Sequence, residues 1–138
     1  MNNPIVLDTH AILWALLKPE ELSEEVKQEI TSAQENSQLF ISSISLWEIA
    51  MLKCKKRINV YEPIKDFLES ISNINGLSIK DISPEIATES VSIIDEFHGD
   101  PADRIIVATA KCCGARLFTR DKKILTWANL GHIKFLPI

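Results

Sequence analysis

Several features that would narrow the class of this protein are scarce in its sequence. Only 3 of its 138 residues are cysteine and only 4 are glycine. An odd number of cysteines, two of them adjacent, excludes the spaced, even set of a disulfide framework and favours a reducing compartment. The chain also has no glycine-rich or proline-rich linker, no internal repeat and no low-complexity stretch, so nothing divides it into separate parts.

Long apolar runs and an excess of basic residues are absent as well. The longest apolar run is far shorter than the ~18 residues that a transmembrane helix requires. The first residues, MNNPIVLDTH, lack the basic start and apolar core of a signal peptide, so we expect a cytoplasmic protein. Nineteen acidic and fifteen basic residues give a formal net charge of −4. That balance is not typical of nucleic-acid-binding domains, but it is compatible with an acidic cluster that holds cations.

What the chain does contain is an alternation of strand-like and helix-like segments. With 46% hydrophobic and 25% charged residues, it has the composition of a globular protein. The alternation predicts one three-layer α/β/α domain over residues 1–138, with a mostly parallel central sheet. Short apolar stretches rich in β-branched residues predict the strands at residues 4–8, 38–42, 77–82, 115–121 and 133–137.

Capping residues mark the expected helix starts. We expect Thr9 to cap the helix after the first strand, and Ser45 to cap a helix over residues 45–56 with Glu48 at the capping-box spacing. The motif GDPADR predicts a further helix start, because Asp100 is a good N-cap and Pro101 suits the first helical position.

Five acidic residues fall at the ends of predicted strands or in the first turns of predicted helices. Parallel α/β folds bring such positions to one edge of the sheet, where ligands bind. Each acid alone is equally well explained by capping or by a turn. Asp81 also follows a predicted strand, and the pattern alone does not exclude it. The five acids are Asp8, Glu48, Asp100, Asp103 and Asp121.

Converging carboxylates repel one another by ~4 kcal/mol for each pair at about 4 Å and an effective dielectric constant near 20. A cluster of them therefore needs bound protons or a cation. Ligands that are all oxygen favour Mg²⁺ or Mn²⁺ over zinc. The scattered histidines and adjacent cysteines offer no zinc-site spacing. The acids thus predict a carboxylate-lined Mg²⁺ or Mn²⁺ site.

Four stretches of the sequence, in this order, resemble the PIN-domain family. They are IVLDTHAILW, ISSISLWEIAMLK, HGDPADRIIVATA and LFTRDKKI. The branch of the family that they resemble is the VapC-like toxins of prokaryotic toxin–antitoxin pairs, and the resemblance covers nearly the whole chain. It implies a metal-dependent ribonuclease with four acids in the catalytic and metal-binding site. The matching positions are Asp8, Glu48, Asp103 and Asp121.

The resemblance also sorts the remaining candidates. Asp100 belongs to the DPxD variant of the third motif and is expected to cap a helix or to support the site from outside. Asp81 has no counterpart in the family. Thr9 and Thr119 border the acids and are candidates to hydrogen-bond a ligating carboxylate or a water molecule, although capping and strand propensity explain them equally well.

The mechanism that the resemblance implies is hydrolysis of RNA phosphodiester bonds. The three matched aspartates would hold one Mg²⁺ or Mn²⁺ ion, and Glu48 would complete the site or take a proton from the attacking water. The implied partners are the RNA substrate, a small cognate antitoxin that blocks the acidic site, and a second copy of the chain in a homodimer or a heteromer with the antitoxin. No membrane is implied.

Other interpretations stay open at this stage. The chief one is a PIN domain that no longer cleaves and only binds RNA or a protein. A phosphate-accepting receiver domain is disfavoured because VLDTH has one acid where that chemistry needs two, and a haloacid-dehalogenase-like phosphatase lacks its DxD motif. The basic run KCKKR (residues 53–57) is a phosphate contact or a solvated surface. His10 and His98 have no assigned role.

Overall fold

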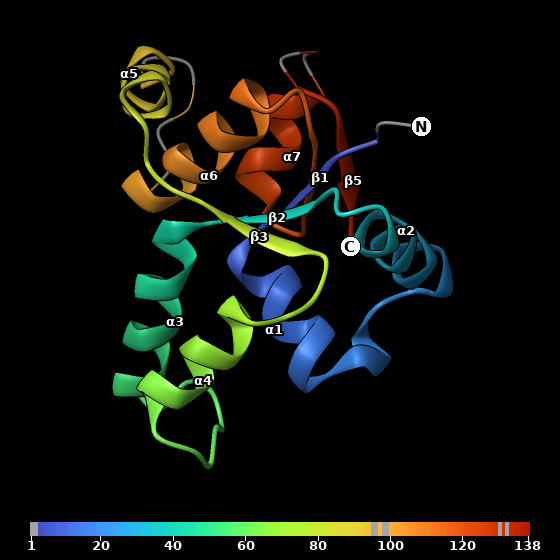
Figure 1. The fold of residues 1–138 in the computed structure, drawn as a ribbon. Helices are drawn as coiled ribbons and strands as arrows, with labels where there is room; N and C mark the ends of the chain where they lie inside the picture. The colour runs from blue at the N-terminus through green and yellow to red at the C-terminus, as the bar shows by residue number, and fades with distance from the viewer. Residues whose placement is uncertain (1–2, 95–96, 98–99, 130, 132) are drawn as a thin grey trace.

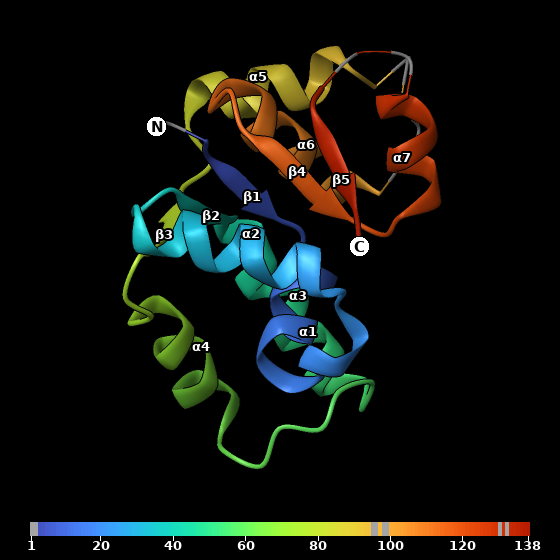
Figure 2. The same ribbon diagram turned by 90° about the vertical axis from the view of Figure 1, so that its right-hand side faces the viewer.

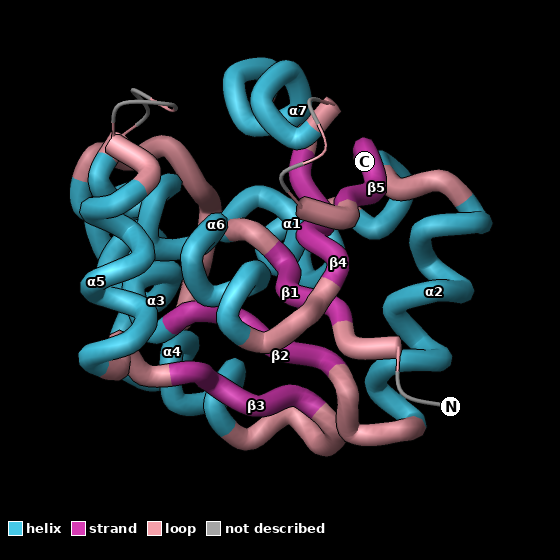
Figure 3. Tube along the Cα trace, turned by 90° about the horizontal axis from the view of Figure 1, so that it is seen from above, coloured by secondary structure: helices cyan, strands magenta, loops and turns pink. Residues whose placement is uncertain are grey.

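A five-stranded sheet forms the middle layer of the protein, as seen in a computed structural model that describes residues 3–94, 97, 100–129, 131 and 133–138 (Figure 1). Its strands are β1 (Ile5–Leu7), β2 (Leu39–Ser42), β3 (Leu77–Lys80), β4 (Arg116–Thr119) and β5 (Phe135–Pro137). They lie in the order β3-β2-β1-β4-β5, which Figure 3 shows from above. Every pair of neighbouring strands is parallel. The predicted α/β class and parallel sheet are therefore confirmed.

Helices cover both faces of this sheet (Figures 1 and 2). They are α1 (Thr9–Leu17), η1 (Pro19–Glu21), α2 (Glu24–Glu35), α3 (Ser43–Cys54), α4 (Ile64–Ser72), α5 (Pro84–Ser92), α6 (Pro101–Cys112) and α7 (Lys122–Ala128). Side chains of α1, α2, α3 and α4 join one buried cluster, and side chains of α6 and α7 join the other. Within the described ranges, no helix is long and apolar enough to cross a bilayer.

The central strands are buried on both faces because successive side chains of a strand point in opposite directions. On β1, Ile5 and Leu7 pack with the α1–α4 cluster, whereas Val6 packs with the α6–α7 cluster. On β4, Phe118 and Leu117 divide in the same way. None of these five side chains is exposed, which is typical of strands covered by helices on both sides. A polar residue that directly follows β1 is therefore shielded from solvent.

The cap of α1 differs from the expectation. Asp8, not Thr9, is the N-cap, and its Oδ1 atom accepts a hydrogen bond from the Ala11 backbone N–H at 2.7 Å. The helix begins at Thr9, one residue earlier than a Thr9 cap allows. The carboxylate of Asp8 reaches the free N–H groups of the first turn, so the Thr9 side chain is available for other contacts.

The start of α3 differs too. β2 runs into α3 without a loop, and Ser42 is both the last strand residue and the N-cap, accepting from the Ile44 N–H at 3.2 Å. Ser45, the expected cap, lies inside the helix and is fully buried. Glu48 consequently lies past the third helical position that a capping box uses, so capping no longer explains its presence.

Candidate metal centre

The topology of the sheet brings the carboxyl ends of β1 and β4 together. The chain proceeds outward from β1 to β2 and β3, and then returns to place β4 on the other side of β1. In open α/β sheets, ligands bind beyond the carboxyl ends of two such strands, and the space between these two strand ends is called the crevice here. Asp8 directly follows β1, and Asp121 comes two residues after β4 ends. The two acids thus flank the crevice.

Asp8 is held by hydrogen bonds at both of its oxygen atoms, and it is only 6% exposed. Oδ1 accepts from Ala11, and Oδ2 accepts from the hydroxyl of Thr119. Thr119 is the fully buried last residue of β4, and its Oγ1 atom accepts from the backbone N–H of Asp121 at 3.0 Å. Thr119 therefore connects the two acids across the crevice.

Asp121 is at once a helix cap and a member of the acidic edge. Its Oδ1 atom accepts from the Ile124 N–H at 3.0 Å and so caps α7. Capping uses one oxygen of the carboxylate and leaves the other. For this residue the capping and ligand interpretations are therefore compatible.

Glu48 approaches the same edge from α3. The Thr9 hydroxyl lies 2.6 Å from Glu48 Oε1 and 3.0 Å from Ser45 Oγ. This contact joins the first turn of α1 to α3 and confirms that Thr9 hydrogen-bonds a candidate carboxylate. The role of Ser45 beside it escaped the sequence reasoning. The available signal was its spacing, because residues three apart on a helix share one face.

Asp103 carries the clearest electrostatic signature. The pKa of its carboxyl is raised from 3.8 to about 7; burial is the largest cause, and the negative charges of Asp121, Glu48, Asp100 and Asp8 add to the rise in decreasing order. Three acids from three other parts of the chain act on this one group together with its neighbour Asp100. The structure therefore brings all five predicted acids into one electrostatic neighbourhood.

The pKa values of Asp8 and Glu48 are raised as well. Burial is the largest cause for both, and hydrogen bonds from Thr119 to Asp8 and from Thr9 to Glu48 oppose it. The charge of Asp121 raises the pKa of Asp8, whereas His10 lowers it. The chain alone therefore gathers more negative charge here than its own groups stabilise.

This donor set fits a hard divalent cation, because every candidate ligand is a carboxylate oxygen and the mutual repulsion is relieved by positive charge. As the side chains lie, no group of three or more His, Cys, Asp and Glu residues within the described part of the chain is close enough to hold an ion. Ligation by three of the acids therefore requires some of their side chains to turn inward.

The remaining candidates lie around this cluster. Asp100 is exposed and caps α6 by accepting from the Ala102 N–H at 3.0 Å, as expected. Asp81 is exposed after β3, at the edge of the sheet and two strands from β1.

The residues of the basic run 53–57 differ in their contacts. Lys53 donates to the backbone carbonyl of Val60, whereas residues 54–57 are exposed. The cysteine within this run and the adjacent pair at the end of α6 are free thiols, as expected. His98 lies outside the described residues. The exposed side chain of Arg120, between Thr119 and Asp121, stacks over Trp14 at 4.1 Å from the ring centre.

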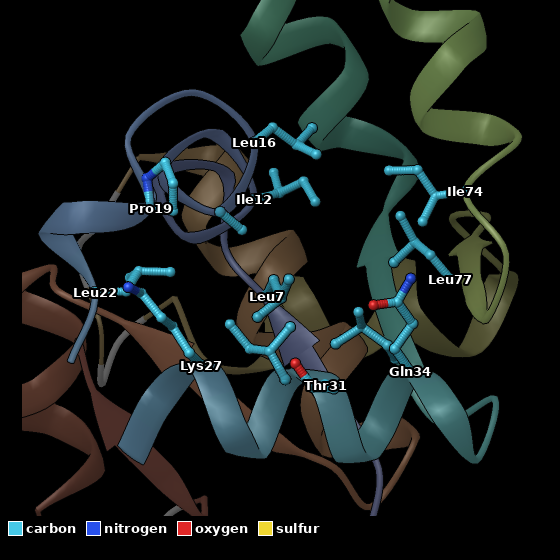
Figure 4. A pocket seen from close by; sticks show the side chains of 13 residues that line it. Leu7, Ile12, Leu16, Pro19, Leu22, Lys27, Thr31, Gln34, Ile74 and Leu77 are labelled. Atoms are coloured by element: carbon cyan, nitrogen blue, oxygen red, sulfur yellow. The ribbon is translucent and has the colours of Figure 1, made fainter. Parts of the chain in front are cut away.

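Among the described residues, two hollows beside α1 are lined by other side chains than the acidic cluster. A groove of about 850 Å³ begins at His10 and follows α1 to the segment 56–62. A cavity of about 290 Å³ lies between α1 and α2, and Figure 4 shows side chains such as Leu7, Ile12 and Leu22 around it. Among the described residues, no acidic side chain lines this cavity. Its apolar lining makes it unsuitable for a metal ion.

Known proteins share sequence with this chain over most of its length. The PIN domain family matches residues 5–129, a range that contains all five acids of the cluster. Ribonuclease VapC22 from Mycobacterium tuberculosis is 34% identical over 120 residues, which cover 87% of this chain and 88% of that protein.

Solved structures are similar over almost the full length. A toxin–antitoxin complex from Klebsiella pneumoniae matches with 26% identity and a TM-score of 0.62, covering 94% of both chains. The DNA-bound VapBC from Salmonella typhimurium matches with a TM-score of 0.71 over 98% of both chains, and at 18% identity it supports the fold alone. The family match and the curated relative together show that this chain belongs to the PIN-domain family.

Proposed function

We propose that this chain is a metal-dependent endoribonuclease and the toxin of a toxin–antitoxin pair. The observation that carries the proposal is the environment of Asp103, where four other carboxylates act on one half-buried carboxyl group. Such a cluster is costly in the chain alone and becomes favourable when a cation is present. The similarity to a protein named a ribonuclease supports RNA as the substrate.

Asp8, Asp103 and Asp121 would hold Mg²⁺ or Mn²⁺, and Glu48 would complete the site. When bound, the ion lowers the pKa of a coordinated water and offsets charge on the phosphoryl oxygens. Thr119 keeps Asp8 and Asp121 in register across the crevice. Glu48, whose pKa is raised by burial, is suited to take a proton from the attacking water.

The proposed partners follow from the named relatives. The solved structures that resemble this chain include a toxin–antitoxin complex at 26% identity. We infer a small antitoxin that covers the acidic edge, and a homodimer or a heteromer with that antitoxin, in the cytoplasm. These inferences rest on similarity, and the acidic edge supplies the surface that an inhibitor has to block.

The test compares two aspartates that both follow a strand. Wild type, Asp8→Asn and Asp81→Asn are each incubated with a pool of structured RNAs in Mg²⁺, Mn²⁺ or EDTA. We expect wild type and Asp81→Asn to cleave RNA only with the divalent cation, and Asp8→Asn to be inactive in all three. Cleavage by Asp8→Asn, or by wild type in EDTA, would contradict the proposed site. If none of the three proteins cleaves RNA, the result favours a PIN domain that only binds RNA or a protein.

A further inference from the structure

Thr9 is a buried polar residue whose hydroxyl the helix start does not use. It is the first residue of α1, but Asp8 caps that helix. The side chain is only 4% exposed, and a buried hydroxyl requires a hydrogen-bond partner. Thr9 meets its partners on α3, 36 and 39 residues further along the chain. The contact therefore depends on tertiary packing and not on local capping.

The number of available protons decides which group donates and which accepts in this contact. A threonine hydroxyl has one proton to donate, and an ionised carboxylate only accepts. At 2.6 Å, the Thr9 proton goes to Glu48 Oε1. Ser45 Oγ, 3.0 Å from Thr9 Oγ1, then acts as the donor to Thr9. The result is a chain of two hydroxyl groups that ends on one oxygen of Glu48.

Glu48 has more need of such support than Asp8. The Asp8 side chain is short, and it is fixed by its own helix and by Thr119. The Glu48 side chain has one more rotatable bond and is only half-buried, so more rotamers are open to it. The bond from Thr9 holds Oε1 and leaves Oε2 for a further partner.

We propose that Thr9 is a positioning residue that fixes the Glu48 carboxylate for a divalent cation and its water, and that Ser45 fixes the direction of the Thr9 hydroxyl. This inference rests on the proposed function, because it presumes that Glu48 serves a metal site. Groups that orient a metal-binding side chain change metal affinity or activity by about 10–100-fold when removed. Thr9 and Ser45 belong in that class.

The experiment first measures metal binding without RNA. Mn²⁺ is titrated calorimetrically into wild type, Thr9→Val, Thr9→Ser and Ser45→Ala, and cleavage kinetics follow on the same proteins. Thr9→Val, which keeps the shape and loses the hydroxyl, is expected to weaken Mn²⁺ binding by about tenfold or more and to lower kcat more than it changes KM. Thr9→Ser, which keeps the hydroxyl, is expected to have wild-type Mn²⁺ affinity and kcat. Ser45→Ala is expected to give values between those of wild type and Thr9→Val.

A matched control and a second background separate positioning from general damage to the fold. Thr88→Val removes a threonine hydroxyl on α5 that donates to the Pro84 carbonyl, and it is expected to behave as wild type. In a Glu48→Ala background, Thr9→Val is expected to cause little further loss, since the two residues act as one unit. A full additional loss there would overturn the proposal, as would wild-type Mn²⁺ affinity in Thr9→Val. If wild type itself neither binds Mn²⁺ nor cleaves RNA, the result contradicts the proposed function itself, on which the role of Thr9 rests.

Discussion

The amino edge and the carboxyl edge of the central sheet differ in how their charged side chains are balanced. At the amino edge, Arg116 begins β4 and pairs with Glu29 of α2 at 2.6 Å. At the carboxyl edge, the same strand ends at Thr119 and is followed by Asp121, whose negative charge raises the pKa of both Asp8 and Asp103. One edge neutralises its charges within the chain. At the other edge carboxylates predominate, and their mutual repulsion raises the pKa of Asp103, so added positive charge is favourable there.

This difference separates residues that stabilise the fold from residues that we propose to serve a ligand. A charge pair within the chain contributes to stability when it is made, and its loss is felt in unfolding experiments. A cluster of like charges lowers stability in the chain alone, so its removal is expected to damage activity and spare or improve the fold.

The largest effect is expected for Asp103→Asn. Loss of this carboxylate removes a proposed ligand at the centre of the cluster, and RNA cleavage should fall on the order of a thousandfold, about 4 kcal/mol of transition-state stabilisation. Initial rates at saturating Mg²⁺ measure it. Asp66→Asn, on the exposed face of α4, is the matched control and should keep the wild-type rate. Equal rates in the two variants would remove Asp103 from the site.

The amino edge should respond in the reverse manner. Arg116→Met keeps the bulk of the side chain but leaves the partly buried Glu29 without its cation, and we expect unfolding to become easier by about 1–2 kcal/mol. Chemical denaturation measures that loss. RNA cleavage at a temperature where the variant is folded should stay within about threefold of wild type, because the pair is at the far edge. A large loss of RNA cleavage in Arg116→Met would contradict the view that the Arg116–Glu29 pair serves stability and not the site.

The third prediction concerns pH in the absence of metal. The pKa of Asp103 is raised from 3.8 to about 7 in the folded chain, so the folded state binds this proton more tightly than the unfolded state does. Its contribution to stability is therefore present below about pH 4, is lost progressively as pH rises to about 7, and stays lost above that. The group is partly exposed, so solvent screening reduces the full shift to about 1–2 kcal/mol.

Denaturation of wild type and Asp103→Asn in EDTA, at intervals from pH 4 to pH 8, isolates this contribution. The variant should become the more stable of the two as pH rises, and added Mg²⁺ should stabilise wild type more than the variant. A constant difference between the two proteins across this range would show that the repulsion is absent.

The smallest effect is expected at Asp100. Its carboxylate caps α6 through the Ala102 N–H, and Asp100→Ala should lower the free energy of unfolding by about 1 kcal/mol. Asp100→Ser retains a capping oxygen and should recover most of that loss, although it removes the charge. Thermal unfolding of the two variants decides whether the cap or the charge matters here. A serine variant as unstable as the alanine variant would contradict the capping role.

Much of the fold was readable from the sequence because its signals are local. Buried apolar residues such as those at 5–7 and 117–118 mark strands buried on both faces, and their alternation with helices implies a parallel sheet. The gathering of acids at one edge followed from the same reasoning. The choice between neighbours Asp100 and Asp103 did not, because both lie at one helix start and their burial depends on packing against other elements.

The errors had a common physical origin. Thr9 and Ser45 are good capping residues by type, but the residue just before each helix took that role. Nothing local shows that β2 passes directly into α3, or that Thr9 meets Ser45 and Glu48 across more than thirty residues. Contacts between distant parts of the chain are decided by the packing of α1 against α3.

The position of β4 beside β1 also sets the time at which the acidic edge comes into being. Synthesis proceeds from the N-terminus, and β1, β2 and β3 can pair while one side of β1 still waits for β4. Asp121 reaches the crevice only when β4 has been made and inserted. A growing chain therefore lacks the hydrogen bonds of Thr119 to Asp8 and Asp121 until this late insertion, and the acidic edge is complete only then.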